Sequence, residues 1–289
     1  MKFKEVLLIM IKILTDSTSV VNQADAKKYG ITVIPLTIAL GNKSYLDGVT
    51  ADSDLVDHYN DTHRNDISRS SQPPIGKFVE AFKKLTKNGD SVLAIMIGDN
   101  FSGTYNVVCK ASKMVKGNIN VINSKTTDQS LRHMVVSAAQ MANSQKYSID
   151  QIINKVDDIR KHSTLYMGVS TLRNLRKNGR IHMFASVLSF IFHLYIVVNL
   201  DINQKLHIAA KGRGKKTFLR WMPRYLNSLK GESIKYMGIS YTGDVKFPKL
   251  LAQKMQHQFP KVPMILRHTS ATITCHTGEN AYAVMTCTK

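Results

Sequence analysis

Serine hydroxyls in two short segments, about 30 residues apart, are the side chains of this sequence best suited to hold an anion. The segments are Ser70-Ser71-Gln72-Pro73-Pro74 and Phe101-Ser102-Gly103-Thr104-Tyr105, and each is predicted to begin a helix. The first N–H groups of a helix have no partner within it, so a hydroxyl beside them completes a site for a negative charge. Together with His276-Thr277-Gly278, the segments predict a pocket for a small carboxylate or phosphate head group.

The surroundings of Ser102 indicate where in the fold this pocket lies. Ser102 follows residues 91–97, a predicted buried strand, after the short connection Gly98-Asp99-Asn100. Ligands of open α/β sheets bind at the carboxyl ends of parallel strands, which is where this arrangement places Ser102. Gly103 lets a ligand approach the backbone, and the neighbouring residues do not form the GxSxG pattern of a nucleophile elbow.

In the first half of the chain, predicted strands and helices alternate. Strands separated by helices, each apolar on both faces, predict a parallel sheet with helices on both sides. The predicted strands are 11–15, 31–36, 91–97 and 119–123, and the predicted helices are 19–29, 52–59, 74–87, one opened by Ser102, 131–143 and 149–161. Asp16-Ser17 and Asn123-Ser124 end two of these strands, so we expect them at the same edge as Ser102.

The second half predicts a mixed sheet with antiparallel pairing among its closely spaced final strands. The strand candidates are 165–169, 206–210, 236–240, 262–267, 272–275 and 281–286, with helices at 171–177, 216–229 and 248–258. We therefore expect an α/β fold of two domains, 1–162 and 163–289, which pack tightly because no Gly/Ser linker separates them. The apolar run 187–198 is shorter than the roughly 20 residues of a membrane-spanning helix and predicts a buried core helix or a helix-to-strand segment.

The composition is strongly basic. Forty Lys and Arg residues against twenty Asp and Glu residues give a formal net charge of +20. Such a charge attracts polyanions, but the basic residues are scattered, and the densest run, Lys211-Gly212-Arg213-Gly214-Lys215-Lys216, is short. The three cysteines lack CxxC spacing, which fits small buried residues in a reducing cytoplasm rather than a disulfide framework or a zinc site.

The amino terminus carries a short apolar stretch without a small-residue cleavage site, so a signal peptide is not expected. Met10 lies directly before the first convincing strand, and Lys4-Glu5-Val6 can be encoded by a ribosome-binding sequence at a suitable spacing from it. We expect Met10 to be the natural start.

Four motifs, in this order along the chain, carry a resemblance to a known family. Besides the two serine segments, they are Leu172-Arg173-Asn174-Leu175-Arg176-Lys177-Asn178-Gly179-Arg180-Ile181 and the basic run at 211–216. The chain resembles the DegV family, whose members include the fatty acid-binding component of bacterial fatty acid kinase. The resemblance runs nearly end to end, from Ile13-Leu14-Thr15-Asp16-Ser17 to His276-Thr277-Gly278.

This resemblance implies a non-enzymatic, cytoplasmic carrier that holds a fatty acid in a tunnel between the domains. It implies no metal and no cofactor other than this ligand, which is presented to a separate kinase for acyl phosphate formation. Carried over by position, the ligand-binding residues are Ser70, Ser71, Ser102, Gly103, Thr104, Arg213, His276 and Thr277. Arg173 and Arg176 fall in the region that the family presents to the kinase, and residues near Phe190 are expected to line the tunnel.

The sequence departs from the family pattern at two places near the expected head group. Pro74 replaces the final serine of the first motif, and Glu279-Asn280 replaces Pro-Gly after the late histidine. Glu279 would repel an anionic head group if its side chain pointed inward. Asn280 can adopt the left-handed conformation that a glycine would supply, so we expect the turn to persist.

Two other function classes stay open at this point. An acyl ester hydrolase would use Ser102 as nucleophile, His276 as base and Asp16 to orient the histidine. A basic binder of nucleic acid or anionic membrane would follow from the net charge alone, and its binding would fall steeply with salt. Nucleic acid is the less expected of these partners, because the basic residues form no dedicated arm.

Overall fold

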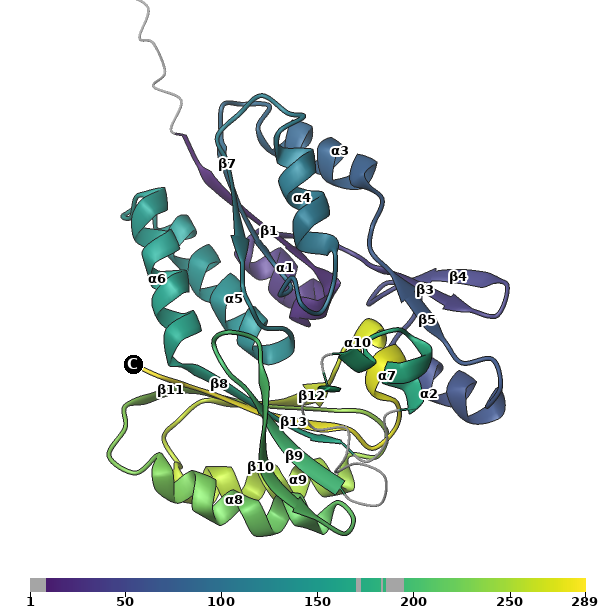
Figure 1. Ribbon diagram of the computed structural model, residues 1–289. Helices are drawn as coiled ribbons and strands as arrows, with labels where there is room; N and C mark the ends of the chain where they lie inside the picture. The colour runs from purple at the N-terminus through teal and green to yellow at the C-terminus, as the bar shows by residue number, and fades with distance from the viewer. Residues whose placement is uncertain (1–8, 170–172, 183, 186–194) are drawn as a thin grey trace, which may run out of the picture.

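The computed structural model describes residues 9–169, 173–182, 184–185 and 195–289 (Figure 1). The strands form three sheets, and helices lie between and outside them. The expected α/β class, with a parallel sheet in the first half and a mixed sheet in the second, is confirmed. Most of the apolar run 187–198 lies outside the described residues, including the part near Phe190 expected to line the tunnel.

The first sheet is parallel and has the order β2-β1-β6-β7. Its strands are β1 (Ile11–Asp16), β2 (Ile31–Ile34), β6 (Ser91–Met96) and β7 (Ile119–Asn123). β6 is buried along its whole length, because Leu93 and Ile95 pack beneath helices on one face while Val92 and Ala94 pack beneath helices on the other. These helices are α3 (Ile75–Leu85), α4 (Thr104–Ser112), α5 (Asp128–Ser144) and α6 (Ile149–His162).

The helix expected at 19–29 is shorter than predicted. A 3-10 turn at Ser17–Ser19 precedes α1 (Gln23–Tyr29), and the Asn22 side chain accepts a hydrogen bond from Asp25 N at the start of that helix. Gly30 ends α1 in the left-handed conformation, as its position in the sequence predicts.

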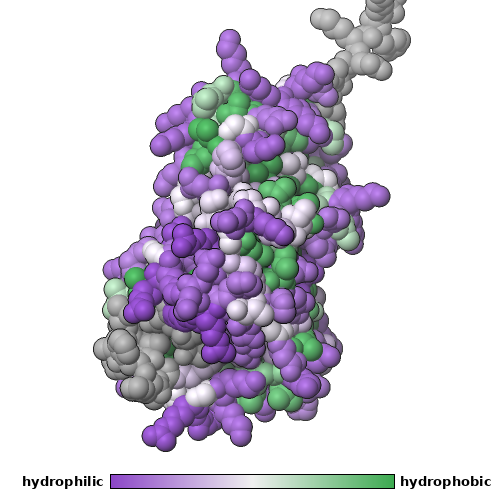
Figure 2. All heavy atoms as spheres, turned by 90° about the vertical axis from the view of Figure 1, so that its right-hand side faces the viewer, coloured by the Kyte–Doolittle hydropathy of each residue, from purple (hydrophilic) through white to green (hydrophobic). Residues whose placement is uncertain are grey.

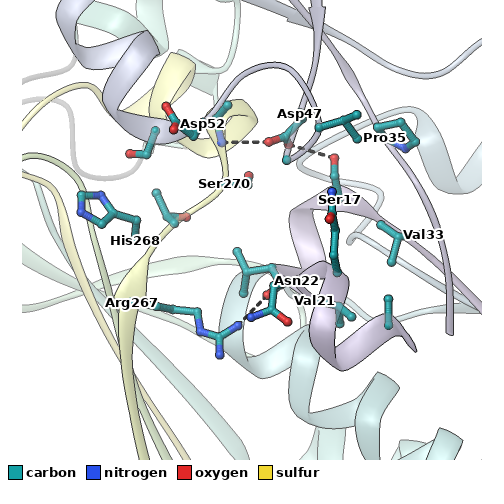
Figure 3. Close-up of a pocket in the computed structure, with 18 of the residues that line it drawn as sticks. Ser17, Val21, Asn22, Val33, Pro35, Asp47, Asp52, Arg267, His268 and Ser270 are labelled. Atoms are coloured by element: carbon teal, nitrogen blue, oxygen red, sulfur yellow. Dashed lines mark hydrogen bonds between the residues drawn. The ribbon is translucent and has the colours of Figure 1, made fainter. Parts of the chain in front are cut away.

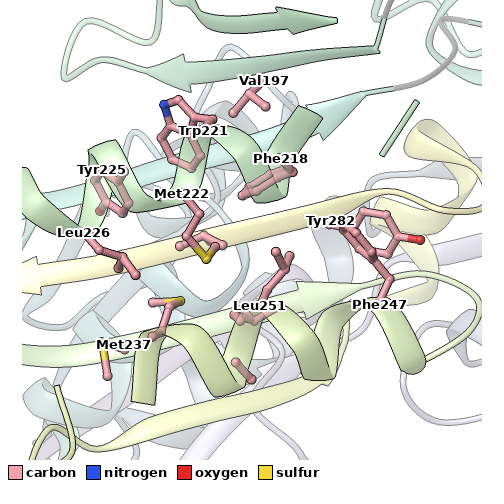
Figure 4. Packing of buried hydrophobic residues seen from close by; sticks show 14 of the residues in the cluster. Val197, Phe218, Trp221, Met222, Tyr225, Leu226, Met237, Phe247, Leu251 and Tyr282 are labelled. Atoms are coloured by element: carbon pink, nitrogen blue, oxygen red, sulfur yellow. The ribbon is translucent and has the colours of Figure 1, made fainter. Parts of the chain in front are cut away.

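The second sheet is mixed and has the order β10-β9-β8-β13-β11-β12, with β11 and β12 parallel and the other neighbours antiparallel. Its strands are β8 (Ser163–Val169), β9 (Tyr195–Leu200), β10 (Leu206–Gly212), β11 (Ile234–Tyr241), β12 (Met264–His268) and β13 (Tyr282–Thr288). α8 (Lys216–Ser228) and α9 (Lys246–Gln258) cover one face, where Phe218, Trp221 and Leu251 form an apolar layer with the strands (Figure 4).

A third sheet, which the sequence analysis did not predict, stands beside the other two (Figure 1). It contains β3 (Thr37–Leu40), β4 (Lys43–Leu46) and β5 (Arg69–Ser71). α2 (Ser53–Thr62), α7 (Arg173–Lys177) and α10 (Ala271–Thr277) lie close to it.

Two predictions are wrong in this region. Ser70 and Ser71 belong to strand β5, paired with β3, and do not begin a helix; α3 begins later, after Pro74. Residues 272–275 are helical and not a strand. The domain boundary near His162 stays a prediction, although α6 ends at His162 and β8 begins at the next residue.

The surface is mainly hydrophilic on the face that carries β4 and α2, and hydrophobic residues form small separate groups there (Figure 2). None of the described helices is long and apolar enough to cross a membrane. All three cysteines are free thiols: Cys275 and Cys287 are buried, and Cys109 is half-buried.

Candidate functional site

A cavity of about 320 Å³ is lined by residues from both halves of the chain, and we call it the central cavity. Most of its wall is apolar. The apolar lining residues are Leu36, Ile97, Phe101, Met167, Leu175, Phe184 and Ile273. The polar lining includes Ser70, Ser71, Gln72, Ser102, Arg180 and His276. An apolar chamber with a few convergent polar groups is typical of a small-molecule site.

Five of the predicted ligand-binding residues line this cavity: Ser70, Ser71, Ser102, His276 and Thr277. They come from three separate elements. The first two lie on β5, Ser102 lies just before α4, and the last two lie at the end of α10. The structure thus brings together residues that are more than two hundred positions apart in the sequence.

His276 and Ser70 form a direct pair across the cavity. The Nε2 atom of His276 lies 2.8 Å from the Ser70 hydroxyl oxygen. Nδ1 of His276 is buried and has no hydrogen-bonding partner among the described residues. Burial, assisted by the positive charge of Arg180, lowers the pKa of His276 to about 4. The imidazole is therefore neutral at pH 7, with one nitrogen as donor and the other as acceptor.

The short helix α10 places His276 at its last turn. The Ser270 side chain accepts a hydrogen bond from Ile273 N and so starts the helix. At the other end, the Asn174 and Asn178 side-chain amides donate to the carbonyl of Cys275. Since both asparagines belong to the segment around α7, the motif at 172–181 holds α10 in position.

Ser102 is oriented by the residues that follow it. Its hydroxyl oxygen lies 2.8 Å from the Thr104 hydroxyl and accepts a hydrogen bond from Thr104 N. Gly103 occupies the N-cap position of α4, and a Cβ there would stand 2.5 Å from Oε1 of Gln72. A glycine at this position therefore lets Gln72 approach the cavity. Gly103 and Thr104 support Ser102 without lining the cavity themselves.

Arg180 is a lining residue that the sequence analysis did not select. Its Nε donates to the carbonyl of Phe101 and its Nη1 to the carbonyl of Asn178. These bonds fix the guanidinium near His276, and we call the part of the cavity lined by Ser70, Ser102, Arg180 and His276 its polar end. Among the described residues that line the central cavity, Arg180 carries the permanent positive charge. The one sequence feature that could have indicated Arg180 as a cavity residue is its place in the motif at 172–181.

The other selected basic residues lie outside the central cavity. Arg213 is exposed in the turn between β10 and α8, and Arg173 and Arg176 are exposed on α7. Glu279 is exposed and does not line the cavity, so it does not face the polar end. Asn280 adopts the left-handed conformation that we expected for it.

The hydrolase triad is not assembled. The Asp16 carboxylate accepts hydrogen bonds from Ile97 N and Thr18 N, and burial raises its pKa to about 6. His276 pairs with Ser70, whereas Ser102 pairs with Thr104. Among the described contacts no hydrogen bond joins the three members that the triad requires, and the geometry does not support a serine nucleophile.

A smaller cavity of about 60 Å³ adjoins the central cavity and extends it along the face of the six-stranded sheet. Both cavities are lined by Met167, Leu175 and Phe184. The Asp128 carboxylate in the smaller cavity accepts hydrogen bonds from the Ser240 and Thr269 hydroxyls. Because these polar groups bind one another, the extension offers mainly apolar contacts to a ligand.

A larger groove of about 950 Å³ lies between α1, the connection before α2 and the start of α10 (Figure 3). None of the predicted ligand-binding residues lines it. Its Asp47 carboxylate accepts hydrogen bonds from the Ser17 hydroxyl and from Ala271 N, and Arg267 donates to the carbonyl of Val20. The Asp47 carboxylate and the Arg267 guanidinium of this groove are thus held by protein partners.

The part of the chain that the structure describes contains no cluster of His, Cys, Asp or Glu side chains that could hold a metal ion. The fold and the central cavity define the class of protein: an α/β protein with an apolar chamber that carries polar groups from both halves of the chain. The family model described as "Uncharacterised protein, DegV family" matches residues 10–289, and this chain belongs to the DegV family.

Curated relatives agree over almost the full length. A DegV domain-containing protein of Streptococcus pneumoniae is 34% identical over 275 residues, which is 95% of this chain and 97% of that protein. A DegV domain-containing protein of Listeria monocytogenes is 31% identical over 279 residues, with 95% and 98% covered.

Solved structures share the fold at lower sequence identity. DegV of Bacillus subtilis, described as a fatty acid binding protein, has a TM-score of 0.88 and 22% identity, covering 97% of this chain and 100% of its own. A stearic acid-binding protein of Eubacterium ventriosum has a TM-score of 0.85 and 20% identity, with 97% and 99% covered.

Proposed function

We propose that this protein binds a fatty acid, with the carboxylate at the polar end of the central cavity and the acyl chain along its apolar wall. The observation that carries the proposal is the convergence of Ser70, Ser102, His276 and Arg180 on one end of an otherwise apolar chamber. A buried carboxylate requires several donors to offset its desolvation, and Ser70, Ser102 and Arg180 supply them. The fatty acid-binding relatives of the same fold support this assignment.

In this proposal His276 acts through Ser70. A proton on Nδ1 would be buried without an acceptor, so the favoured tautomer carries its proton on Nε2 and donates it to the Ser70 oxygen. The Ser70 hydroxyl proton is then free to point into the cavity toward the carboxylate. His276 is thus a positioning residue for Ser70, in place of the direct donor that the family resemblance implies.

A carrier binds a fatty acid without cleaving an acyl ester, and this distinguishes the proposal from the alternative of an acyl ester hydrolase. We expect palmitate to bind with an affinity that changes little with salt, since burial of the acyl chain is not screened by ions. An activated acyl ester incubated with the protein is expected to show no turnover above the buffer rate. Ester cleavage that is lost in Ser102→Ala would contradict the carrier assignment, and affinity that falls steeply with salt would favour a polyanion binder.

We further propose that the protein presents the bound fatty acid to a separate kinase through the face around α7. Arg173 and Arg176 are exposed there, on the helix that packs against α10 and therefore near the polar end of the cavity. A cationic patch of this kind suits a partner with an acidic surface.

The double variant Arg173→Glu, Arg176→Glu reverses the charge of this patch. We expect its palmitate affinity to stay within about 2-fold of the wild type, and the rate of phosphorylation by the kinase to fall at least about 10-fold. The measurement pairs a palmitate titration with a phosphorylation assay using purified kinase. Charge reversal at Lys83 and Lys84, on the distant helix α3, is the matched control. Loss of palmitate affinity in the arginine variant would show that these residues support the cavity instead.

A further inference from the structure

The connection that leads from β6 to Ser102 is contacted by a hairpin of the six-stranded sheet. Strands β9 and β10 are joined by a tight turn at 201–205, and Gln204 of this turn lies against Asp99 and Asn100. The Gln204 side-chain amide donates to the Asp99 carboxylate at 2.7 Å. Two longer hydrogen bonds join Gln204 to Asn100: Oε1 accepts from the Asn100 backbone N at 3.4 Å, and the Gln204 carbonyl accepts from the Asn100 side chain at 3.3 Å.

The turn of the hairpin fixes the position of Gln204. The Asp201 carboxylate accepts hydrogen bonds from Asn203 N and Lys205 N, and the Asp201 carbonyl accepts one from Gln204 N. Gln204 has a φ of 62°, which is the left-handed conformation that favours glycine or asparagine. Since the backbone alone would be better served by one of these residues, a glutamine here points to a role for its side chain.

The contact reaches Ser102 through a short and compact stretch of chain. Phe101 N and Ser102 N both donate to the carbonyl of Gly98, so residues 98 to 102 form one turn. A Cβ at Gly98 would lie 2.6 Å from Oε1 of Gln204, and the glycine therefore lets the side-chain amide rest against this turn. Phe101 packs against the apolar cluster of the six-stranded sheet that includes Leu200. Movement of the turn would shift the Ser102 hydroxyl.

We infer that Gln204 is a positioning residue for Ser102 and sets the place of its hydroxyl at the polar end of the central cavity. The inference rests on the proposed fatty acid binding, in which Ser102 receives the carboxylate. The hydrogen bond from Gln204 is the largest cause that lowers the pKa of Asp99, so this carboxylate is charged at pH 7 and binds the amide firmly. Ser70 and His276 belong to other elements and keep their places when the contact is lost.

Hydrogen–deuterium exchange of the ligand-free full chain tests the positioning. Gln204→Glu brings a second carboxylate against Asp99, and we expect the amides of residues 98–104 to exchange at least about 5-fold faster than in the wild type. The double variant Asp99→Asn, Gln204→Glu exchanges carboxylate and amide between the two positions and should restore the wild-type rate. Gln253→Glu, the same change in an exposed residue of α9, is the matched control. Wild-type exchange in Gln204→Glu, or fast exchange that the double variant does not slow, would overturn the inference.

Palmitate titration separates a role through Ser102 from a general loss of stability. We expect Gln204→Glu to weaken palmitate binding by about 3- to 10-fold, and the double variant to bind as the wild type does. In a Ser102→Ala background, Gln204→Glu should cause no further loss, because the hydroxyl that it positions is absent. An equal loss in both backgrounds would contradict the inference.

The wild type distinguishes the two levels of the account. Wild-type protein that binds no palmitate would contradict the proposed fatty acid binding and, with it, the role of Gln204. A wild type that binds palmitate, together with Gln204→Glu of unchanged affinity, would contradict the role of Gln204 alone.

Discussion

Replacement of Arg180 by methionine is expected to weaken palmitate binding by about 10- to 100-fold, because hydrogen bonds to a charged group contribute about 1.5–3 kcal/mol. Methionine keeps much of the apolar stem of the arginine side chain and removes only the guanidinium. The effect should be among the largest of any single substitution in the cavity, since Arg180 carries the positive charge nearest to the polar end. Calorimetric titration with palmitate measures it.

Hexadecanol is the matched ligand control, because it has the same chain and no charge. We expect hexadecanol to bind the wild type and Arg180→Met with similar affinity. Equal losses for palmitate and hexadecanol would show that Arg180 acts through packing, for example through its bonds to Phe101 and Asn178. Unchanged palmitate affinity would remove Arg180 from the head-group site.

Substitution of Ser70 and His276, singly and together, is expected to show strong coupling. Each of Ser70→Ala and His276→Ala should weaken palmitate binding by about 1–3 kcal/mol, because each removes the same oriented hydroxyl proton. The double variant should then be about as weak as either single variant. Such non-additivity is the signature of two groups in one hydrogen-bonded unit.

The outcome that contradicts this arrangement is additivity, in which the two losses sum in the double variant. Additive losses would mean that His276 contacts the ligand independently of Ser70. His268→Ala is the matched control, since His268 lines the larger groove and not the central cavity. Its palmitate affinity should equal that of the wild type.

From the sequence, several residues of the polar end could be selected, but the secondary-structure elements that carry them could not be predicted. Ser70 and Ser71 were selected as ligand-binding residues, which stays a prediction, and they line the central cavity. They were expected at a helix start, because Pro73 and Pro74 follow them. The structure places them on β5, whose pairing with β3 spans about thirty residues. Pairing of that range depends on tertiary contacts that no local pattern records.

The region around His276 shows the same limit. The β-branched residues of 272–274 favour a strand by local propensity. In the structure the Ser270 cap and the buried packing of Thr274 and Cys275 outweigh that preference, and the segment is helical. Arg180 was missed for a related reason: its position in the cavity follows from the docking of α7 against α10, which sequence spacing does not reveal.

The parallel sheet was predictable because its signals are local and strong. Residues 92–97 form an unbroken apolar run, and apolar residues of α3 such as Phe78 and Phe82 recur at helical spacing on one face. The basic composition, by contrast, indicated polyanionic partners but did not indicate which surface of the protein would bind them.

Mass spectrometry of the purified full chain, first native and then denatured, tests the central claim most directly. The account predicts a native mass that exceeds the chain by one long-chain fatty acid, and release of that fatty acid on denaturation. The bound fraction should fall in Arg180→Met and stay unchanged in His268→Ala. A protein that carries no ligand, and that also fails to bind added fatty acids of any chain length, would contradict the account.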